Sequence, residues 1–129
     1  MTIPHRQSFD IEGISHTVPI PMGTRVGNLL VSSGIMGMDS NTGKLPEALA
    51  DQVRCAFANM ATLLRLAGGD PGDVAHVRVL VAEESYRGAI NIEWLTYFPD
   101  KDSRPARHTV VSALRGGMLV QLEIMAVLK

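Results

Sequence analysis

The longest regular pattern in the sequence is helical and covers residues 46–67. Apolar side chains recur there at steps of three and four residues, so one helix face carries Leu49, Val53, Phe57, Met60 and Leu64. Pro46 suits the first turn of a helix, where its missing N–H needs no partner, and Gly68 and Gly69 supply the stop. A helix with one apolar face must pack on a second layer, so the chain has to provide one elsewhere.

Strand patterns on both sides of this helix supply that layer. The predicted elements are strands at 29–33, 77–81, 108–113 and 119–128 and a second helix at 89–98, stopped by Pro99. The near-continuous hydrophobic run at 29–33 predicts a strand buried on both faces. The last two strands, joined through residues 115–117, are expected to form a hairpin.

Turns and glycines divide the N-terminal third of the chain. Residues 6–16 are predicted to form a hairpin turning at Glu12-Gly13, followed by an irregular, extended segment through Pro19, Pro21 and Gly23. Residues 39–43 form a further turn, and Gly34 and Gly37 would allow a close approach to another chain or a ligand.

This order of elements predicts an α+β fold, a mixed β-sheet with both helices packed on one face. Residues 1–129, 46% of them hydrophobic, are expected to form one domain. Alternation along the strands places His108 under the helices, as a core histidine. The uncovered face would carry Arg107, Thr109, Gln121, Glu123 and Met125, a mixture that invites association.

Charge and cysteine content exclude several functions. The formal net charge is −1 with no basic stripe, so nucleic acid is not the expected partner. Cys55, the single cysteine, lies in the first helix, which favours packing over chemistry. No apolar stretch is long enough to span a bilayer, and residues 1–5 lack a signal-peptide pattern, so a cytoplasmic location is expected.

The spacing of the residues also argues against several common kinds of functional site. Metal binding is not expected, because the four histidines do not stand at the short spacings that are typical of metal ligands. They are His5, His16, His76 and His108. Residues 37–44 faintly resemble a phosphate loop, but Leu45 stands where a hydroxyl would bind magnesium. No serine-hydrolase elbow is present, and Ser32-Ser33 have no obvious base.

The best functional signal lies near the C-terminus. Arg107 lies on a predicted strand, and Gln121 and Glu123 alternate on the next. A guanidinium fork beside an amide and a carboxylate could hold a planar carboxylate. The alternative is two exposed strand edges with solvated charges.

A resemblance rests on several motifs taken in order. They are the segment 27–34, the turn Asn41-Thr42-Gly43, the Ala-rich segment ending Ala67-Gly68-Gly69, Asn91, Arg104-Pro105-Ala106-Arg107 and Val120-Gln121-Leu122-Glu123. The chain resembles the YjgF/RidA family of reactive intermediate (imine/enamine) deaminases, formerly also called the endoribonuclease L-PSP family. The resemblance implies a chorismate-mutase-like fold and a homotrimer with ligand clefts between subunits. It also implies cofactor-free hydrolysis of small imine or enamine carboxylates to 2-keto acids and ammonia.

The resemblance also assigns site residues. Arg107 matches the family's carboxylate-binding arginine, and Thr109 stands where deaminases generally have cysteine. Gln121 replaces the glutamate credited with orienting the attacking water, and an amide cannot take the water's proton. Glu123 could substitute if the strand shifts, although it also matches a second family acid.

The remaining pocket positions are carried over in the same way. Ser33 and Gly34 would line the opposite wall, and Ile20 stands in place of a tyrosine, which makes the pocket more apolar. Asn91 is retained, but on a helix flank it could equally be a cap or packing residue. Three alternatives stay open: a non-catalytic binder of keto acids, favoured by Gln121, a deaminase of a bulkier aminomuconate-like intermediate, and a ribonuclease, against which the charge balance argues.

Overall fold

The computed structural model describes residues 5–14 and 16–129. The expectation about a signal peptide falls mainly on residues 1–4, which lie outside the described residues. The strands are β1 (Arg6–Phe9), β2 (Gly23–Val26), β3 (Leu29–Ser32), β4 (Ile35–Met36), β5 (Val74–Val81), β6 (Ala106–Val111) and β7 (Val120–Val127). The helices are α1 (Leu49–Leu66) and α2 (Arg87–Tyr97), with the short 3-10 helices η1 (Pro71–Asp73) and η2 (Glu84–Tyr86).

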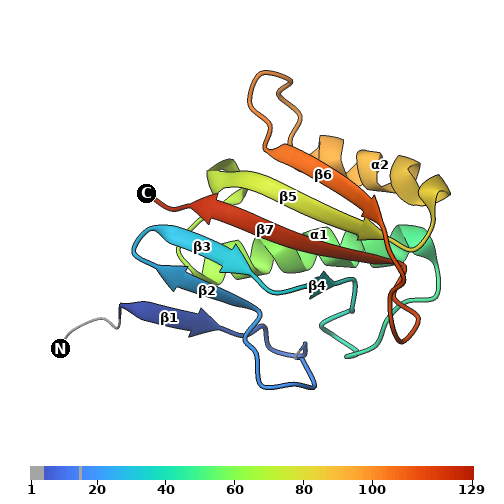
Figure 1. Ribbon diagram of the computed structural model, residues 1–129, viewed down its shortest axis with the longest axis horizontal. Helices are drawn as coiled ribbons and strands as arrows, with labels where there is room; N and C mark the ends of the chain where they lie inside the picture. Colours follow the sequence, from blue (N-terminus) through green and yellow to red (C-terminus); the bar gives the residue numbers. More distant parts are fainter. Residues whose placement is uncertain (1–4, 15) are drawn as a thin grey trace.

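The strands form one sheet in the order β1-β2-β3-β7-β5-β6, and β4 also pairs with β7. Pairing of β5 with β6 is parallel and every other pairing is antiparallel, so the predicted mixed sheet is confirmed. Figure 1 shows both helices on the same side of the sheet, with α1 behind the central strands and α2 beside β6. The predicted final hairpin is wrong, because β7 lies between β3 and β5 while β6 is an edge strand.

Alternation along the strands creates two different faces. In β7 the residues Leu122, Ile124 and Ala126 are buried against the helices, while their odd-numbered neighbours point to the other face. The apolar stripe predicted for α1 is buried against this sheet, except that Leu49 is only partly covered. The core therefore lies between the sheet and the helices.

The first helix is shorter than predicted at its N-terminus. It begins at Leu49, three residues after Pro46, whose carbonyl accepts a hydrogen bond from Nε2 of buried Gln52 at 2.8 Å. The bond ties the segment before the helix to the first turns of the helix. At the other end Gly68 has a φ of +89°, a conformation that favours glycine, so the predicted stop is confirmed.

The predicted strand pairing of the N-terminal hairpin is wrong. The turn at Glu12-Gly13 exists and is closed by an isolated Ile11–Ile14 bridge, but β1 pairs with β2. The irregular segment was predicted to run through residue 23, and β2 begins there. Ser15, which the predicted hairpin includes, lies outside the described residues.

The face of the sheet away from the helices is open in this chain and carries an apolar patch over β3 and β7. Leu29 pairs with Val127 and Val31 with Met125, and their exposed fractions are 39%, 51%, 37% and 46%. The prediction that 29–33 is buried on both faces is therefore wrong for a single chain. Neither helix in the described part is long and apolar enough to cross a membrane.

Candidate functional site

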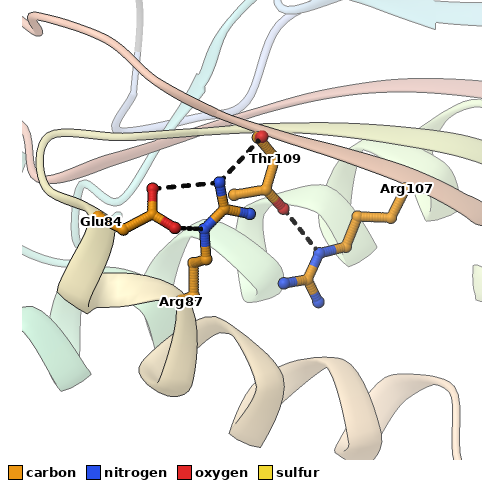
Figure 2. A network of polar contacts seen from close by, with 4 residues as sticks. All are labelled: Glu84, Arg87, Arg107 and Thr109. Carbon is orange, nitrogen blue, oxygen red and sulfur yellow. Dashed lines mark hydrogen bonds and ion pairs between the residues drawn. The ribbon is translucent and has the colours of Figure 1, made fainter.

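Arg107 lies on the helix side of the edge strand β6. Its partner in the parallel register is Val77, which is fully buried beneath the helices. The guanidinium carbon lies 5.1 Å from the ring centroid of Trp94 on α2, a cation–π distance. Its Nε donates a hydrogen bond to Oγ1 of Thr109 at 2.9 Å, as Figure 2 shows.

The predicted common face for Arg107, Thr109, Gln121 and Glu123 is wrong. Arg107 and Thr109 pair with buried positions of β5, whereas Gln121 and Glu123 pair with Leu80 and Arg78 on the open face. The face that a residue occupies depends on strand register, and alternation within one strand cannot fix the register between strands. A charged side chain can point to the helix side because β6 is at the edge of the sheet.

The prediction for His108 fails for the same reason. Its register partner is Arg78, so His108 lies on the open face and is exposed, not under the helices.

A second arginine stands beside the first but is already neutralised. Nε of Arg87 contacts Oε1 of Glu84 at 2.5 Å, and Nη2 donates to Oε2 of Glu84 at 3.3 Å and to the Thr109 carbonyl at 3.4 Å (Figure 2). No described carboxylate forms an ion pair with Arg107. Burial, and secondarily the charge of Arg87, lower the pKa of Arg107. Among the described residues, the group of Glu84, Arg87, Arg107 and Thr109 thus holds one cation without a counter-ion.

One face of α2 lies next to Arg107 and carries three of the residues around it. Arg87, Asn91 and Trp94 are spaced by four and three residues, which places them on the same side of the helix. Asn91 is exposed and makes no side-chain hydrogen bond within the described residues. The sequence reasoning missed Glu84, Arg87 and Trp94, although the spacing from Asn91 could have identified the last two.

A second group forms where β4 meets β7. Gly34 packs so closely on Gln121 that a methyl group at Gly34 would overlap the amide. The predicted close approach at Gly34 and Gly37 is therefore present, but within the chain: Gly34 meets Gln121 and Gly37 meets the α1 backbone at Gln52. Ser33 precedes Gly34, is partly buried and donates its N–H to the Met22 carbonyl at 2.8 Å.

His16 connects this group to Ile20. Nε2 of His16 lies 3.0 Å from the carbonyl oxygen of Gly34. His16 and Ile20 also line a shared open pocket of about 370 Å³. His16 is thus the residue through which Ile20 is linked to Gly34.

Glu123 lies apart from Gly34. It is opposite Arg78 and lines an open-face pocket of about 240 Å³ with Val31, His76 and Met125. Two residues of strand separate it from Gln121, roughly 7 Å. Among the two candidates, Gln121 is the one in contact with Gly34.

The site residues therefore form two groups that do not meet within one chain. Arg107 and Thr109 lie on the helix side of β6, and Gly34 and Gln121 lie across β5 near the opposite face. Two strand spacings alone amount to roughly 10 Å. The described residues contain no cluster of three metal-ligating side chains, and Cys55, whose pKa is raised chiefly by burial, lies in neither group.

Comparison with known proteins gives a consistent result. The sequence model of the family described as Endoribonuclease L-PSP matches residues 17–128. A mouse 2-iminobutanoate/2-iminopropanoate deaminase is 32% identical over 111 residues, 84% of this chain and 81% of the relative. The Escherichia coli deaminase of the same name is 27% identical over 111 residues, 84% of this chain and 87% of its own.

Solved structures share the fold. The YjgF gene product of Escherichia coli superposes with a TM-score of 0.86 at 25% identity, covering 95% of this chain and 99% of the other. RidA from the Antarctic bacterium Psychrobacter sp. PAMC 21119 gives 0.86 at 26% identity with the same coverage. These similarities confirm the predicted fold of one chain.

Proposed function

Because the chain belongs to the endoribonuclease L-PSP family, which includes the YjgF and RidA proteins, we propose that it hydrolyses small imine or enamine carboxylates. Relatives 27–34% identical are named imine deaminases, which supports the activity at the level of the family. The products would be a 2-keto acid and ammonia, and no cofactor is required. The single cysteine and the balanced charge suit a cytoplasmic protein.

The observation that carries the proposal is the unpaired charge of Arg107. Its Nε is held by Thr109, which leaves the two terminal nitrogens for a ligand. The nearby charges are two arginines and one glutamate, so a bound carboxylate would neutralise the group. Burial strengthens such a pairing because it weakens solvent screening.

Hydrolysis of an imine requires few catalytic groups besides the one that binds the carboxylate. Water adds to the carbon of the C=N bond, a proton passes to nitrogen, and the C–N bond then breaks to release ammonia and leave a carbonyl. Imines already hydrolyse in water, so the main task is to hold the carboxylate and to place one water molecule. We assign the water to Gln121, whose amide can bind it but cannot remove its proton, with Glu123 as a second candidate. Ser33, Gly34 and Ile20 would form the facing wall, and Asn91 would line the arginine side.

We further propose a homotrimer in which the two groups meet across a subunit boundary. One chain separates Arg107 from Gln121, so a second copy is needed to bring such groups together. The apolar patch on β3 and β7 offers the association surface. Light scattering should give three times the chain mass of 13.9 kDa.

A second candidate function is non-catalytic binding of 2-keto acids, and Gln121 is the observation that favours it. The deciding assay measures ammonia and keto acid released from freshly generated imines by the native protein, by Gln121→Glu and by Gln7→Glu. Gln7 is an exposed residue of β1 and controls for the added charge. Native turnover above buffer supports the deaminase; no native turnover together with a gain in Gln121→Glu alone supports the binder.

A further inference from the structure

A largely apolar pocket of about 360 Å³ lies next to the Gly34–Gln121 group. We call it the methionine pocket, and its apolar walls are Val18, Met36, Met38, Leu45 and Met118. Its volume falls within the range of about 300–1,000 Å³ that is typical of small-molecule sites. Methionine side chains are flexible and polarizable, so such walls adapt to unbranched apolar ligands.

Two residues join the methionine pocket to the proposed site. Met36 is the register partner of Gln121, so the two side chains leave the sheet on the same face. His16 lines the pocket, and its ring bonds to the carbonyl of Gly34. A ligand beside Gln121 could therefore extend into the pocket.

The hydrogen bonding of His16 leaves one of its ring nitrogens without a partner among the described residues. A carbonyl oxygen only accepts hydrogen bonds, so Nε2 of His16 must carry the proton that bonds to Gly34. The other ring nitrogen, Nδ1, is then an acceptor in the neutral ring, and it is buried without a partner among the described residues. Buried polar atoms are rarely left unpaired, so a donor is expected there. An apolar side chain has none, so the donor would be a water molecule or the imine N–H at the reacting end of the ligand.

We propose that the methionine pocket receives the substrate side chain, and that the preferred substrates are 2-imino acids with a long, unbranched apolar side chain. The inference rests on the proposed function, because it assigns the reacting end of the molecule to the Arg107 and Gln121 groups. Arg115 is the one charged residue among the lining residues, and it is exposed. Solvent screens the charge of an exposed guanidinium, so the apolar walls decide the preference and favour a hydrocarbon or thioether chain over a second carboxylate.

The test compares imines made from norleucine, from 2-aminobutyrate and from glutamate, in native protein and in Leu45→Trp. Filling the pocket should lower kcat/KM for the norleucine imine by about tenfold or more and leave the short imine within about twofold. Leu66→Trp, a change at an exposed residue of α1, serves as the matched control. Met118→Trp fills the same pocket from another segment and should repeat the result if Leu45→Trp does not fold.

Binding separates this inference from the activity itself. Calorimetry with 2-oxohexanoate and 2-oxobutanoate should show tighter native binding of the longer acid, by about tenfold, and the pocket-filling variants should abolish the difference. If native protein hydrolyses no imine but keeps this preference, the proposed reaction fails and the pocket assignment stands. Equal native affinity for the two acids, a preference for the glutamate imine, or pocket-filling variants that spare the long ligand would each overturn the assignment.

Discussion

The Nε–H of Arg107 donates to Oγ1 of Thr109, 2.9 Å away and two residues along the same strand (Figure 2). Because the residues lie two apart on β6, both side chains leave the same face. The hydroxyl therefore fixes the direction of the guanidinium while the terminal nitrogens stay unpaired by any described carboxylate. This bond makes Thr109 a positioning residue for Arg107.

Replacing that hydroxyl should weaken ligand binding without harming the fold. Thr109→Val keeps the shape of the side chain but removes the acceptor, so binding of 2-oxobutanoate should weaken by about 1–2 kcal/mol. Thr109→Ser keeps a hydroxyl and should bind almost as the native protein does. Calorimetry measures both, and equal affinity of the valine and serine variants would show that the bond has no positioning role.

Removing the cation itself should have a larger effect. Arg107→Ala should weaken binding of 2-oxobutanoate by about 2–5 kcal/mol, because the ligand carboxylate loses its partner. The free energy of unfolding should change by less than about 1 kcal/mol, since a weak cation–π contact is lost and repulsion from Arg87 is relieved. Arg104→Ala removes a nearby charge whose hydrogen bonds to described residues go to the carbonyls of Phe98 and Pro99, so this variant should bind normally. Similar binding by both alanine variants would refute the role of Arg107.

Two glycines of different surroundings should respond oppositely to alanine. Gly34→Ala forces a methyl group into the Gln121 amide and should lower the free energy of unfolding by about 1–3 kcal/mol. Gly88 lies in the first turn of α2 with open space around it, so Gly88→Ala should raise that free energy by about 0.5–1 kcal/mol. Urea unfolding measures both, and adding Gln121→Ala should recover part of the Gly34→Ala loss. A harmless Gly34→Ala would mean that the amide is free to move away.

Buried Gln52 should be important for stability. Its Nε2 donates to the carbonyls of Pro46 and Gly117 at 2.8 and 3.1 Å, and its Oε1 accepts from the Leu119 N–H at 2.9 Å. Gln52→Leu leaves these backbone groups without their partner and should lower the free energy of unfolding by about 2–4 kcal/mol. Hydrogen exchange at the Leu119 amide should become faster. Gln7→Leu on exposed β1 should change stability by no more than about 0.5 kcal/mol.

The thiol of Cys55 should react slowly. Burial, with a smaller effect of Asp39, raises its pKa, so less thiolate is present at a given pH than in the unfolded chain. The pH profile of alkylation by iodoacetamide should therefore lie at higher pH in the folded protein than in urea. Cys55→Ser should keep full ligand binding. Faster alkylation of the folded protein at pH 7 would contradict the assignment of Cys55 to packing.

The sequence predicted the helices better than the strand pairings. The end of α1 at Gly68 depends on the glycine at that position, and the apolar face of the helix follows from the spacing of its own residues. Both can be predicted without knowledge of the rest of the fold. The strand β2 was missed because it is only four residues long and follows two prolines. Its partner β3 begins after only two residues, Gly27-Asn28, so this hairpin could have been predicted from local sequence, whereas the pairing of β2 with β1 could not. The final hairpin failed because β6 and β7 are joined in sequence but separated in space by β5.

The candidate site shows the same division. Arg107, Gly34 and Gln121 could be named from local motifs, and Gly34 does contact Gln121. The side of the sheet that Arg107 occupies could not be predicted, because it depends on the register of β6 on β5. The surroundings of Arg107 likewise come from α2 and η2, which only the tertiary fold brings to β6.

The central position of β7 also determines when the sheet can form. During synthesis β3 and β5 are made before residues 120–127, the strand that is the neighbour of both in the folded sheet. Their facing edges stay open until residues 120–127 have been made, a state that is prone to aggregation in a chain whose β3 already carries apolar side chains on both faces. A nascent chain that stalls before residue 120 can still pair β1, β2 and β3 with one another and β5 with β6, but it cannot join these two sets of strands into one sheet.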